Sequence, residues 1–280
     1  MYEGEHVREQ VRVQLGRALK HTSSAIDRVR PPTDGITVLI YHRVGGRTPV
    51  PVDLPTSLFR DQMAELADRV VDLDGALDAL EGPAPTKGTP RPVVVTFDDG
   101  TADVIEEALP VLVDLKVPAL LYVATDFVER GIDFPDDGKV VSWAALADGV
   151  STGYLQLGSH THSHALLDRL ADDQVAGELD RSIELIGERT GATAAHFAYP
   201  KALQGAAEAD RLVRDRFRSA AIAGTRANPY RATDPWTLAR SPIQVSDDLR
   251  WFRAKANGGL GLEDDLRRTI NRIRYRGASS

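Results

Sequence analysis

Short apolar runs rich in β-branched residues recur along most of the chain, and amphipathic stretches separate them. The runs have the length of buried parallel strands and lie at 36–42, 92–99, 118–124, 154–160, 195–200 and 219–224. Apolar residues at helical spacing occupy the stretches at 57–70, 71–80, 102–115, 143–147, 172–190 and 206–217. Repeated β–α units with largely apolar strands predict a closed or doubly wound parallel α/β architecture.

Two amphipathic stretches lie outside this alternation. Residues 5–28 carry apolar side chains at near-helical spacing, and the Pro31-Pro32 pair ends the stretch. We expect a helix packed on the flank of the main domain, with a membrane-surface or partner-binding helix as the alternative. A second helix is expected at 262–277, where arginines gather toward the C-terminal end. The predicted organisation is an N-terminal extension at 1–34, a main domain at 35–250 and a helical tail at 251–280.

Composition narrows the class of protein. With 280 residues, of which 42% are hydrophobic and 27% charged, the chain can bury one large core. Its formal net charge of -7 gives no general attraction to nucleic acid, and its lack of cysteine leaves His, Asp and Glu to bind any transition metal. The N-terminus lacks the pattern of a secretory signal, and no apolar run reaches membrane-spanning length. These features predict a cytoplasmic protein without a transmembrane segment, with association at the periphery of the cell envelope as the alternative.

Two adjacent carboxylates, Asp98 and Asp99, follow one of the apolar runs and precede Gly100. In α/β proteins the carboxyl ends of the strands are where sites assemble. Neighbouring carboxylates repel each other there unless a cation or hydrogen-bond donors neutralise them. An Asp-Asp-Gly sequence alone is equally typical of a turn or a helix cap, so the pair needs a second feature before it indicates a site.

A cluster of histidines supplies that second feature. His160, His162 and His164 lie within five residues and follow Gly158-Ser159 at the end of another apolar run. If the chain enters a helical turn there, His160 and His164 face the same side, whereas His162 faces the opposite side. Together with Asp99 they provide a two-histidine, one-carboxylate metal site that leaves positions for water and substrate. Zn²⁺ is the first candidate, and Co²⁺, Ni²⁺ or Fe²⁺ would suit the same ligands.

The segments VVVTFDDG, LGSHTHSHALL and FAYP, in this order and at these separations, resemble the polysaccharide deacetylases with the NodB-like fold. The resemblance extends over about residues 36–245. It implies an irregular (β/α)7 barrel as the main domain. It also implies that Asp98 is the general base and that Asp99, His160 and His164 bind the metal.

The chain departs from the family pattern in its late motif. Many members have a histidine in a late LxH motif as the general acid, but Arg240 stands there in this chain, and arginine does not release a proton at neutral pH. We therefore expect His42, in IYHRV, to protonate the leaving amine, with a hydrogen-bonded core histidine as the alternative. With an early histidine as the acid, the chain resembles the branch of the family that includes the poly-N-acetylglucosamine deacetylases.

A second departure affects the segment FAYP, which replaces the more common RxPY pattern. The arginine that the family uses to position the catalytic aspartate is Ala198 here, and Lys201 stands where tyrosine is usual. The backbone N–H of Lys201 could still stabilise an oxyanion, because a main-chain donor does not depend on the side chain. Tyr199 is a second candidate for contact with the substrate or only shapes the wall. Asp103 and Arg240 would support Asp98 or contact the sugar, the alternatives being a helix-start acid and a surface arginine.

These residues together predict a metal-dependent hydrolase that removes N-acetyl groups from an amino sugar. A metal polarises the acetamide carbonyl and lowers the pKa of water, as amide hydrolysis requires near neutral pH. The expected partner is an N-acetylated carbohydrate, either a glycan, an oligosaccharide or a glycosylated metabolite. One alternative is an O-acetyl esterase or sugar deformylase with the same site. The other is a catalytically weak, metal-containing carbohydrate-binding protein, which the departures from the family motifs suggest.

Overall fold

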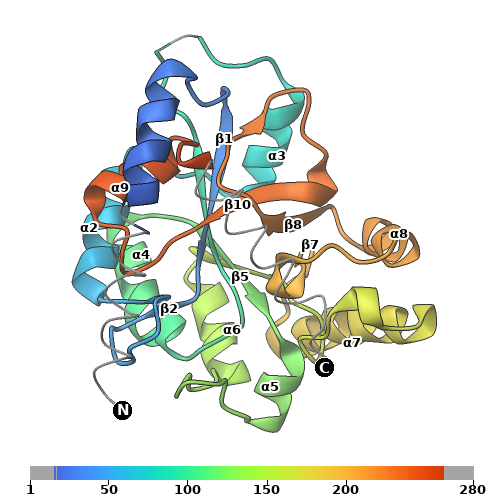
Figure 1. Ribbon diagram of the computed structural model, residues 1–280. Helices are drawn as coiled ribbons and strands as arrows, with labels where there is room; N and C mark the ends of the chain where they lie inside the picture. The colour runs from blue at the N-terminus through green and yellow to red at the C-terminus, as the bar shows by residue number, and fades with distance from the viewer. Residues whose placement is uncertain (1–15, 17, 87, 262–280) are drawn as a thin grey trace, which may run out of the picture.

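The computed structural model describes residues 16, 18–86 and 88–261, and its centre is a closed barrel of parallel strands (Figure 1). The seven barrel strands are β1 (Gly35–Tyr41), β4 (Val93–Phe97), β5 (Ala119–Val123), β6 (Leu155–Ser159), β7 (His196–Ala198), β8 (Ser219–Ala223) and β10 (Leu238–Pro242). Each strand pairs in parallel with the next in this order, and β10 pairs in parallel with β1. The predicted (β/α)7 barrel is therefore confirmed, and the doubly wound alternative is excluded because the sheet closes.

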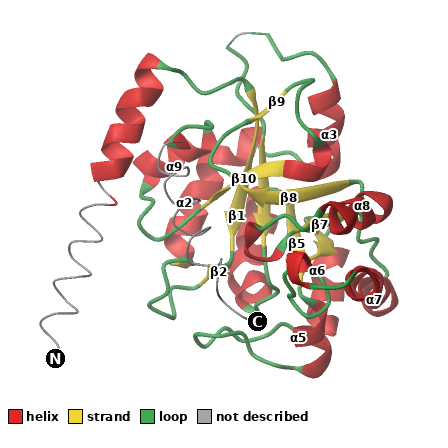
Figure 2. Cartoon of the chain, turned by 45° about the vertical axis from the view of Figure 1, so that its right-hand side comes forward, coloured by secondary structure: helices red, strands yellow, loops and turns green. Residues whose placement is uncertain are grey.

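Helices surround the barrel and cover the outer faces of its strands, as Figure 2 shows. They are α2 (Thr56–Leu66), α3 (Leu73–Glu81), α4 (Leu109–Leu115), α5 (Thr125–Arg130), α6 (Trp143–Ser151), α7 (Asp172–Thr190), α8 (Ala207–Arg216) and α9 (Leu249–Ala256). The helix expected at 102–115 is divided into a π-helical turn η2 (Val104–Ala108) and α4. Outside the barrel, β2 (Arg43–Val44) pairs with β3 (Asp53–Leu54), and β9 (Asn228–Pro229) lies antiparallel to the start of β1.

The strands form where the sequence is apolar because both of their faces are buried. Every residue of β1, β4 and β5 is buried, which explains why these strands read as continuous apolar runs. On one flank Phe59 of α2 packs between Tyr41 and Phe97, at ring-centroid distances of 5.2 and 5.8 Å. The hydrophobic pattern does not predict β10, whose sequence LARSP is fully buried but polar in part.

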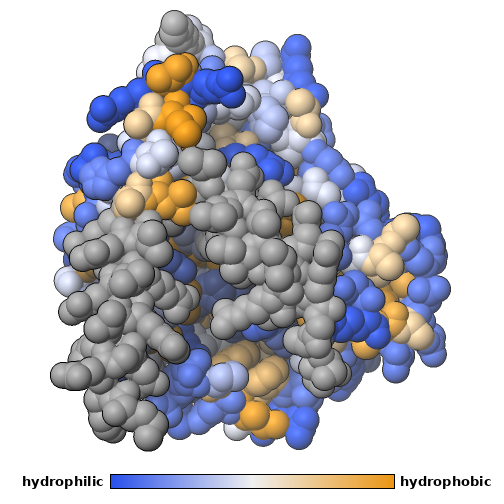
Figure 3. All heavy atoms as spheres, viewed as in Figure 1, coloured by the Kyte–Doolittle hydropathy of each residue, from blue (hydrophilic) through white to orange (hydrophobic). Residues whose placement is uncertain are grey.

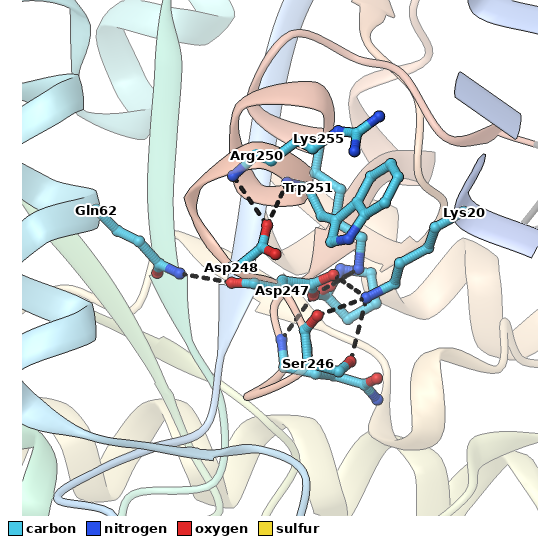
Figure 4. Close-up of polar contacts among 10 residues, drawn as sticks. Lys20, Gln62, Ser246, Asp247, Asp248, Arg250, Trp251 and Lys255 are labelled. Carbon is cyan, nitrogen blue, oxygen red and sulfur yellow. Dashed lines mark hydrogen bonds and ion pairs between the residues drawn. The ribbon is translucent and has the colours of Figure 1, made fainter. Parts of the chain in front are cut away.

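A helix at residues 18–29 lies on the flank of the barrel beside α9, at the upper left of Figure 1. Lys20 of this helix is only 3% exposed, and its Nζ lies 2.5 Å from Oδ1 of the fully buried Asp247. Lys255 of α9 approaches the other carboxylate oxygen at 2.7 Å, so one carboxylate holds two ammonium groups (Figure 4). The outer side of the helix exposes Ile26 and Val29, and an apolar group of residues lies over it in Figure 3.

Part of the predicted organisation lies outside the described residues, namely the helix at 262–277 and the start of the helix at 5–28. The helix α9 crosses residue 250, and its Phe252 belongs to the hydrophobic core. The domain boundaries at 34 and 250 stay predictions. None of the helices in the described part of the chain has both the length and the apolar character that crossing a membrane requires.

Candidate active site

The candidate residues come together at one end of the barrel because each follows the carboxyl end of a strand. His42 follows β1, Asp98 and Asp99 follow β4, and His160 follows β6. Backbone hydrogen bonds hold these strand ends side by side: the Asp98 N–H donates to the carbonyl of Tyr41 at 3.1 Å, and the His160 N–H donates to that of Val123 at 3.0 Å. The site therefore occupies the end of the barrel where parallel α/β proteins place their chemistry.

Close packing of β6 against its neighbours fixes the strand that leads to the histidines. A Cβ atom at Gly158 would lie 2.8 Å from the carbonyl oxygen of His196 on β7 and 2.8 Å from a ring carbon of Tyr122 on β5. Only glycine fits between these atoms, so the strand has little freedom to shift.

Three potential metal ligands converge in front of this strand. Nε2 of His160 lies 3.7 Å from Oδ1 of Asp99, and Nε2 of His164 lies 3.5 Å from the same oxygen. One ligand atom from each of the three residues lies within 4.8 Å of the other two. Nδ1 of His160 lies 2.7 Å from the carbonyl oxygen of Ala198, which can only accept, so Nδ1 carries the proton and Nε2 has its lone pair free.

The local backbone brings these ligands together in a different way from the one expected. Residues 160–164 form an irregular loop with bends at residues 162 and 163 rather than a helical turn, and Thr161 and His164 adopt left-handed conformations, with φ of 63° and 61°. Asp99 is also left-handed, with φ of 76°. Such conformations are uncommon outside glycine and cluster at functional sites. The pairing of His160 with His164 follows from these bends, and the helical-turn assumption is wrong.

His162 points away from this group. Its Nδ1 lies 2.9 Å from the hydroxyl of Thr125, and its Nε2 lies 3.7 Å from a carboxylate oxygen of Asp126. The Asp126 N–H also donates to the His162 carbonyl at 2.8 Å. His162 therefore ties the loop after β6 to the start of α5.

Electrostatics favour neutral imidazoles at the site. Burial lowers the pKa of His160. Burial and the neighbouring His160 lower the pKa of His164 to about 4. Neutral imidazole and ionised carboxylate are the forms that bind a divalent metal. Because His160 and His164 are neutral and lie near a carboxylate, the group Asp99, His160 and His164 fits such an ion.

Asp98 lies beside this group in a buried ion pair. Both of its oxygens accept from the guanidinium of Arg240, from Nη1 at 2.7 Å and from Nη2 at 2.9 Å. Burial is the largest single influence and raises the pKa of the Asp98 carboxyl, but the charge and hydrogen bonds of Arg240 together with the charges of His160 and His42 outweigh it, and the pKa is lowered to about 2. Asp98 is therefore ionised throughout the neutral range.

The structure separates the roles expected for the remaining candidates. Arg240 is fully buried, so it supports Asp98 and presents no surface to a sugar. Tyr199 is also fully buried, and its hydroxyl donates to Asp210 at 2.8 Å, which fits the alternative that it only shapes the wall. Asp103 does not reach Asp98 through a hydrogen bond; it accepts from the hydroxyl of Thr101 at 2.8 Å, and burial raises its pKa to about 6.

His42 and Lys201 are the two remaining candidates, and they lie near Asp98 and His164 respectively. Nδ1 of His42 is buried and has no hydrogen-bond partner among the described residues, while its charge contributes to lowering the pKa of Asp98. Lys201 follows β7 in a left-handed conformation, with φ of 54°, and its charge contributes to lowering the pKa of His164. Within the described residues the Lys201 N–H donates no hydrogen bond, so it is free for a ligand.

Three supporting contacts have no signal in the sequence. The carbonyl of Ala198 orients His160, and a backbone oxygen is present at every residue. Thr96 accepts from Arg240 at 3.1 Å, and the ring of Tyr122 lies 4.9 Å from its guanidinium carbon. Both side chains lie inside strands that read simply as apolar.

Comparison with known proteins agrees with this geometry. Residues 86–217 match the family model of the polysaccharide deacetylases. Among solved structures, IcaB from Ammonifex degensii is 26% identical, with a TM-score of 0.67 over 81% of this chain and 99% of that chain. The deacetylase PplD from Streptococcus pyogenes, in complex with acetate, is 18% identical, with a TM-score of 0.69 over 80% of this chain and 99% of that chain.

A third structure, the BpsB deacetylase domain from Bordetella bronchiseptica, is 20% identical, with a TM-score of 0.60 over 76% of this chain and 97% of that chain. The likeness to PplD and BpsB concerns the fold alone, and no curated protein matches the sequence. The family match and the barrel with its strand-end site define a hydrolase of the carbohydrate N-deacetylase class. Residues 86–217, just under half of the chain, thus match the polysaccharide deacetylase family, and the barrel that contains them is of the NodB-like type.

Proposed function

We propose that this deacetylase is metal-dependent and removes N-acetyl groups from an amino sugar in a glycan, an oligosaccharide or a glycosylated metabolite. The observation that carries the proposal is the arrangement of two neutral histidines and Asp99 next to the ionised Asp98. It combines a site for a Lewis acid with a separate carboxylate that is free to accept a proton.

Asp99, His160 and His164 would hold the metal, with Zn²⁺ as the first candidate because two imidazoles and one carboxylate suit it. When bound, a divalent metal polarises the acetyl carbonyl and makes water more acidic. The hydrogen bond from Nδ1 of His160 to the Ala198 carbonyl leaves Nε2 as the atom that would coordinate the metal.

The other residues move protons and stabilise charge. Asp98 takes the proton from the attacking water, and its low pKa ensures that it is unprotonated when substrate binds. His42, on the neighbouring strand end, gives a proton to the leaving amine. The free N–H of Lys201 donates to the oxyanion that forms on the acetyl carbonyl.

The contact between Arg240 and Asp98 argues against the alternative that the chain is a catalytically weak carbohydrate-binding protein. That alternative was suggested partly by the loss of the arginine at Ala198, but a guanidinium on β10 pairs with the aspartate instead. A base held in this way favours turnover over binding alone.

Incubation of the purified chain and Zn²⁺ with N-acetylglucosamine oligomers tests the proposal. We expect acetate and a free amine on the product, measured by enzymatic acetate assay and mass spectrometry. Asp98→Asn should reduce the rate by about 10³-fold, within the range that general base catalysis supplies. Formate release would indicate a deformylase, and release only from O-acetylated sugars would indicate an esterase. Binding of the oligomer without any turnover by the metal-loaded protein would refute hydrolysis.

A further inference from the structure

We propose that the pocket between the helix at 18–29 and the start of α9 binds a small sugar that carries a phosphate or carboxylate group. The pocket has a volume of about 350 Å³ and is lined by His21, Val245, Ser246, Asp248, Arg250 and Trp251. Its volume lies at the lower end of the range of small-molecule sites, which suits one sugar unit. None of the candidate active-site residues lines it, so the inference goes beyond the proposed deacetylation.

An excess of buried positive charge adjoins this pocket (Figure 4). Lys20 and Lys255 are 3% and 2% exposed, and among the described residues Asp247 is the only carboxylate within ion-pair distance of either ammonium group. A charge removed from water is costly unless it is paired, and a bound anion would reduce that cost. Lys20 also donates to the carbonyl and to the hydroxyl of Ser246, both at 3.1 Å, so the cluster reaches the pocket wall.

Three side chains of the wall keep unused hydrogen-bonding groups. The Ser246 hydroxyl accepts from Lys20, which leaves its own proton to donate. Within the described part of the chain, the Arg250 guanidinium makes no hydrogen bond or ion pair, and it lies 4.5 Å from the centroid of the Trp251 ring. The His21 ring packs perpendicular to the same indole, with centroids 4.9 Å apart, and neither of its nitrogens bonds to a described residue.

These groups match the charged part of such a ligand. A guanidinium forms two parallel hydrogen bonds to a phosphate or a carboxylate, and stacking on an indole restricts its orientation. The hydroxyl of Ser246 and a ring N–H of His21 would each add one bond. The wall therefore recognises the chemistry that the two anions share.

Other groups of the wall favour a sugar over a bare anion. Asp248 caps α9 through Oδ1 alone, which lies 3.0 Å from the backbone nitrogen of Arg250 and 3.1 Å from that of Trp251. Among the described residues its Oδ2 accepts no hydrogen bond, so this oxygen is available to sugar hydroxyls. A bare phosphate would meet the negative charge of Asp248 without such a bond. Val245 is 44% exposed and offers the sugar ring an apolar contact.

The competing explanation is that the buried cluster only attaches the helix at 18–29 to the barrel. Attachment accounts for Lys20, but it assigns no task to Arg250 on its indole or to the free oxygen of Asp248. It also predicts no affinity for anionic sugars, so a binding measurement separates the two explanations.

Isothermal titration calorimetry at constant ionic strength tests the proposal with glucose 6-phosphate, glucuronate, glucose and inorganic phosphate. None of these probes carries an acetyl group, so the Zn²⁺-loaded chain cannot consume them by deacetylation. We expect at least one anionic sugar to bind about tenfold or more tightly than glucose and inorganic phosphate, since a hydrogen bond to a charged group is worth that much. The tighter of the two anionic sugars shows whether the pocket selects phosphate or carboxylate.

Variants locate the bound sugar. Arg250→Met should weaken the binding of the tighter anionic sugar by about tenfold or more. Lys20→Met should weaken it by about tenfold because it removes the buried charge, and Ser246→Ala gives a second test if that variant does not fold. Arg253→Met is the matched control, because this arginine lies on the same helix and its guanidinium pairs with Glu65, so the affinity should equal that of wild type.

Each outcome decides the proposal. It would be overturned by unchanged affinity in Arg250→Met, by inorganic phosphate that binds as tightly as both anionic sugars, or by a folded wild type that binds neither sugar. A chain that releases no acetate would overturn the proposed function and leave this proposal intact, because no probe reports on turnover.

Discussion

The substitution Lys20→Met tests how the helix at 18–29 is attached to the barrel. It removes the ammonium group that contacts Asp247 at 2.5 Å and both the carbonyl and the hydroxyl of Ser246 at 3.1 Å (Figure 4). Methionine keeps nearly the same length and adds no charge. The apolar part of the side chain can therefore stay packed while the ionic contact is lost.

The expected loss of stability follows from what Asp247 retains. Removing one partner of a buried pair costs about 3–5 kcal/mol when the other charge is left alone. Asp247 keeps Lys255 at 2.7 Å and the N–H of Gln244 at 2.9 Å, so we expect a smaller loss of about 2 kcal/mol, that of one charged hydrogen bond. For a domain of this size the melting temperature should fall by about 4–8 °C.

The loss should also depend on pH. Burial raises the pKa of the Asp247 carboxyl, but Lys255 and Lys20 lower it further, so the net shift is downward. A carboxyl whose folded-state pKa is lowered stabilises the fold above its unfolded pKa of about 4, and this contribution disappears as the pH falls through the folded-state value. The difference between wild type and Lys20→Met should therefore be full at pH 7 and shrink below about pH 4.

Urea unfolding at pH 7 and at pH 3 measures both effects. Lys139→Met is the matched control, because the Lys139 side chain is 75% exposed and pairs with Asp133 on the surface, and its loss should not change the free energy of unfolding measurably. If Lys20→Met unfolds at the same urea concentration as Lys139→Met at pH 7, the buried contact does not hold the helix and the reasoning is wrong.

Three further predictions concern the site. His160→Ala and His164→Ala should each reduce the amount of bound zinc, whereas His162→Ala should retain it because that ring contacts a hydroxyl outside the group; equal loss in all three would contradict the ligand assignment. His42→Ala should lower kcat by about 100-fold with bound metal unchanged, and full activity would show that another group protonates the amine. Zn²⁺ at a hundred times its dissociation constant should raise the free energy of unfolding of the wild type by about 2.7 kcal/mol in urea titrations, and no change would argue against a metal site.

The sequence predicts the part of the fold that burial on both faces determines. Strands such as β1 and β4 are apolar at every buried position, so periodicity and length identify them. It does not predict β10, because Arg240 and Ser241 interrupt its apolar character even though both are fully buried. Pairing within the barrel fixes this strand, and no local pattern records such a tertiary contact.

At the candidate site too, local sequence patterns predict some residues, while others depend on tertiary contacts. The clusters around Asp98 and His160 stand out because unusual residue types follow apolar runs. The bends that turn His160 and His164 toward each other depend on left-handed residues that are not glycine, which no simple spacing argument anticipates. The partner of Asp98 lies 142 positions away in the chain, and only the closed barrel brings the two together.

The pairing of β1 with β10 closes the barrel and also completes the candidate site. His42 directly follows the end of β1, and β10 carries Arg240 opposite Val38 of β1. The proposed acid and the residue that holds the proposed base thus come from the two strands that close the barrel, while the metal ligands come from β4 and the loop after β6. A change that loosens the β1–β10 seam should therefore impair proton transfer at the site even where the metal ligands remain in place.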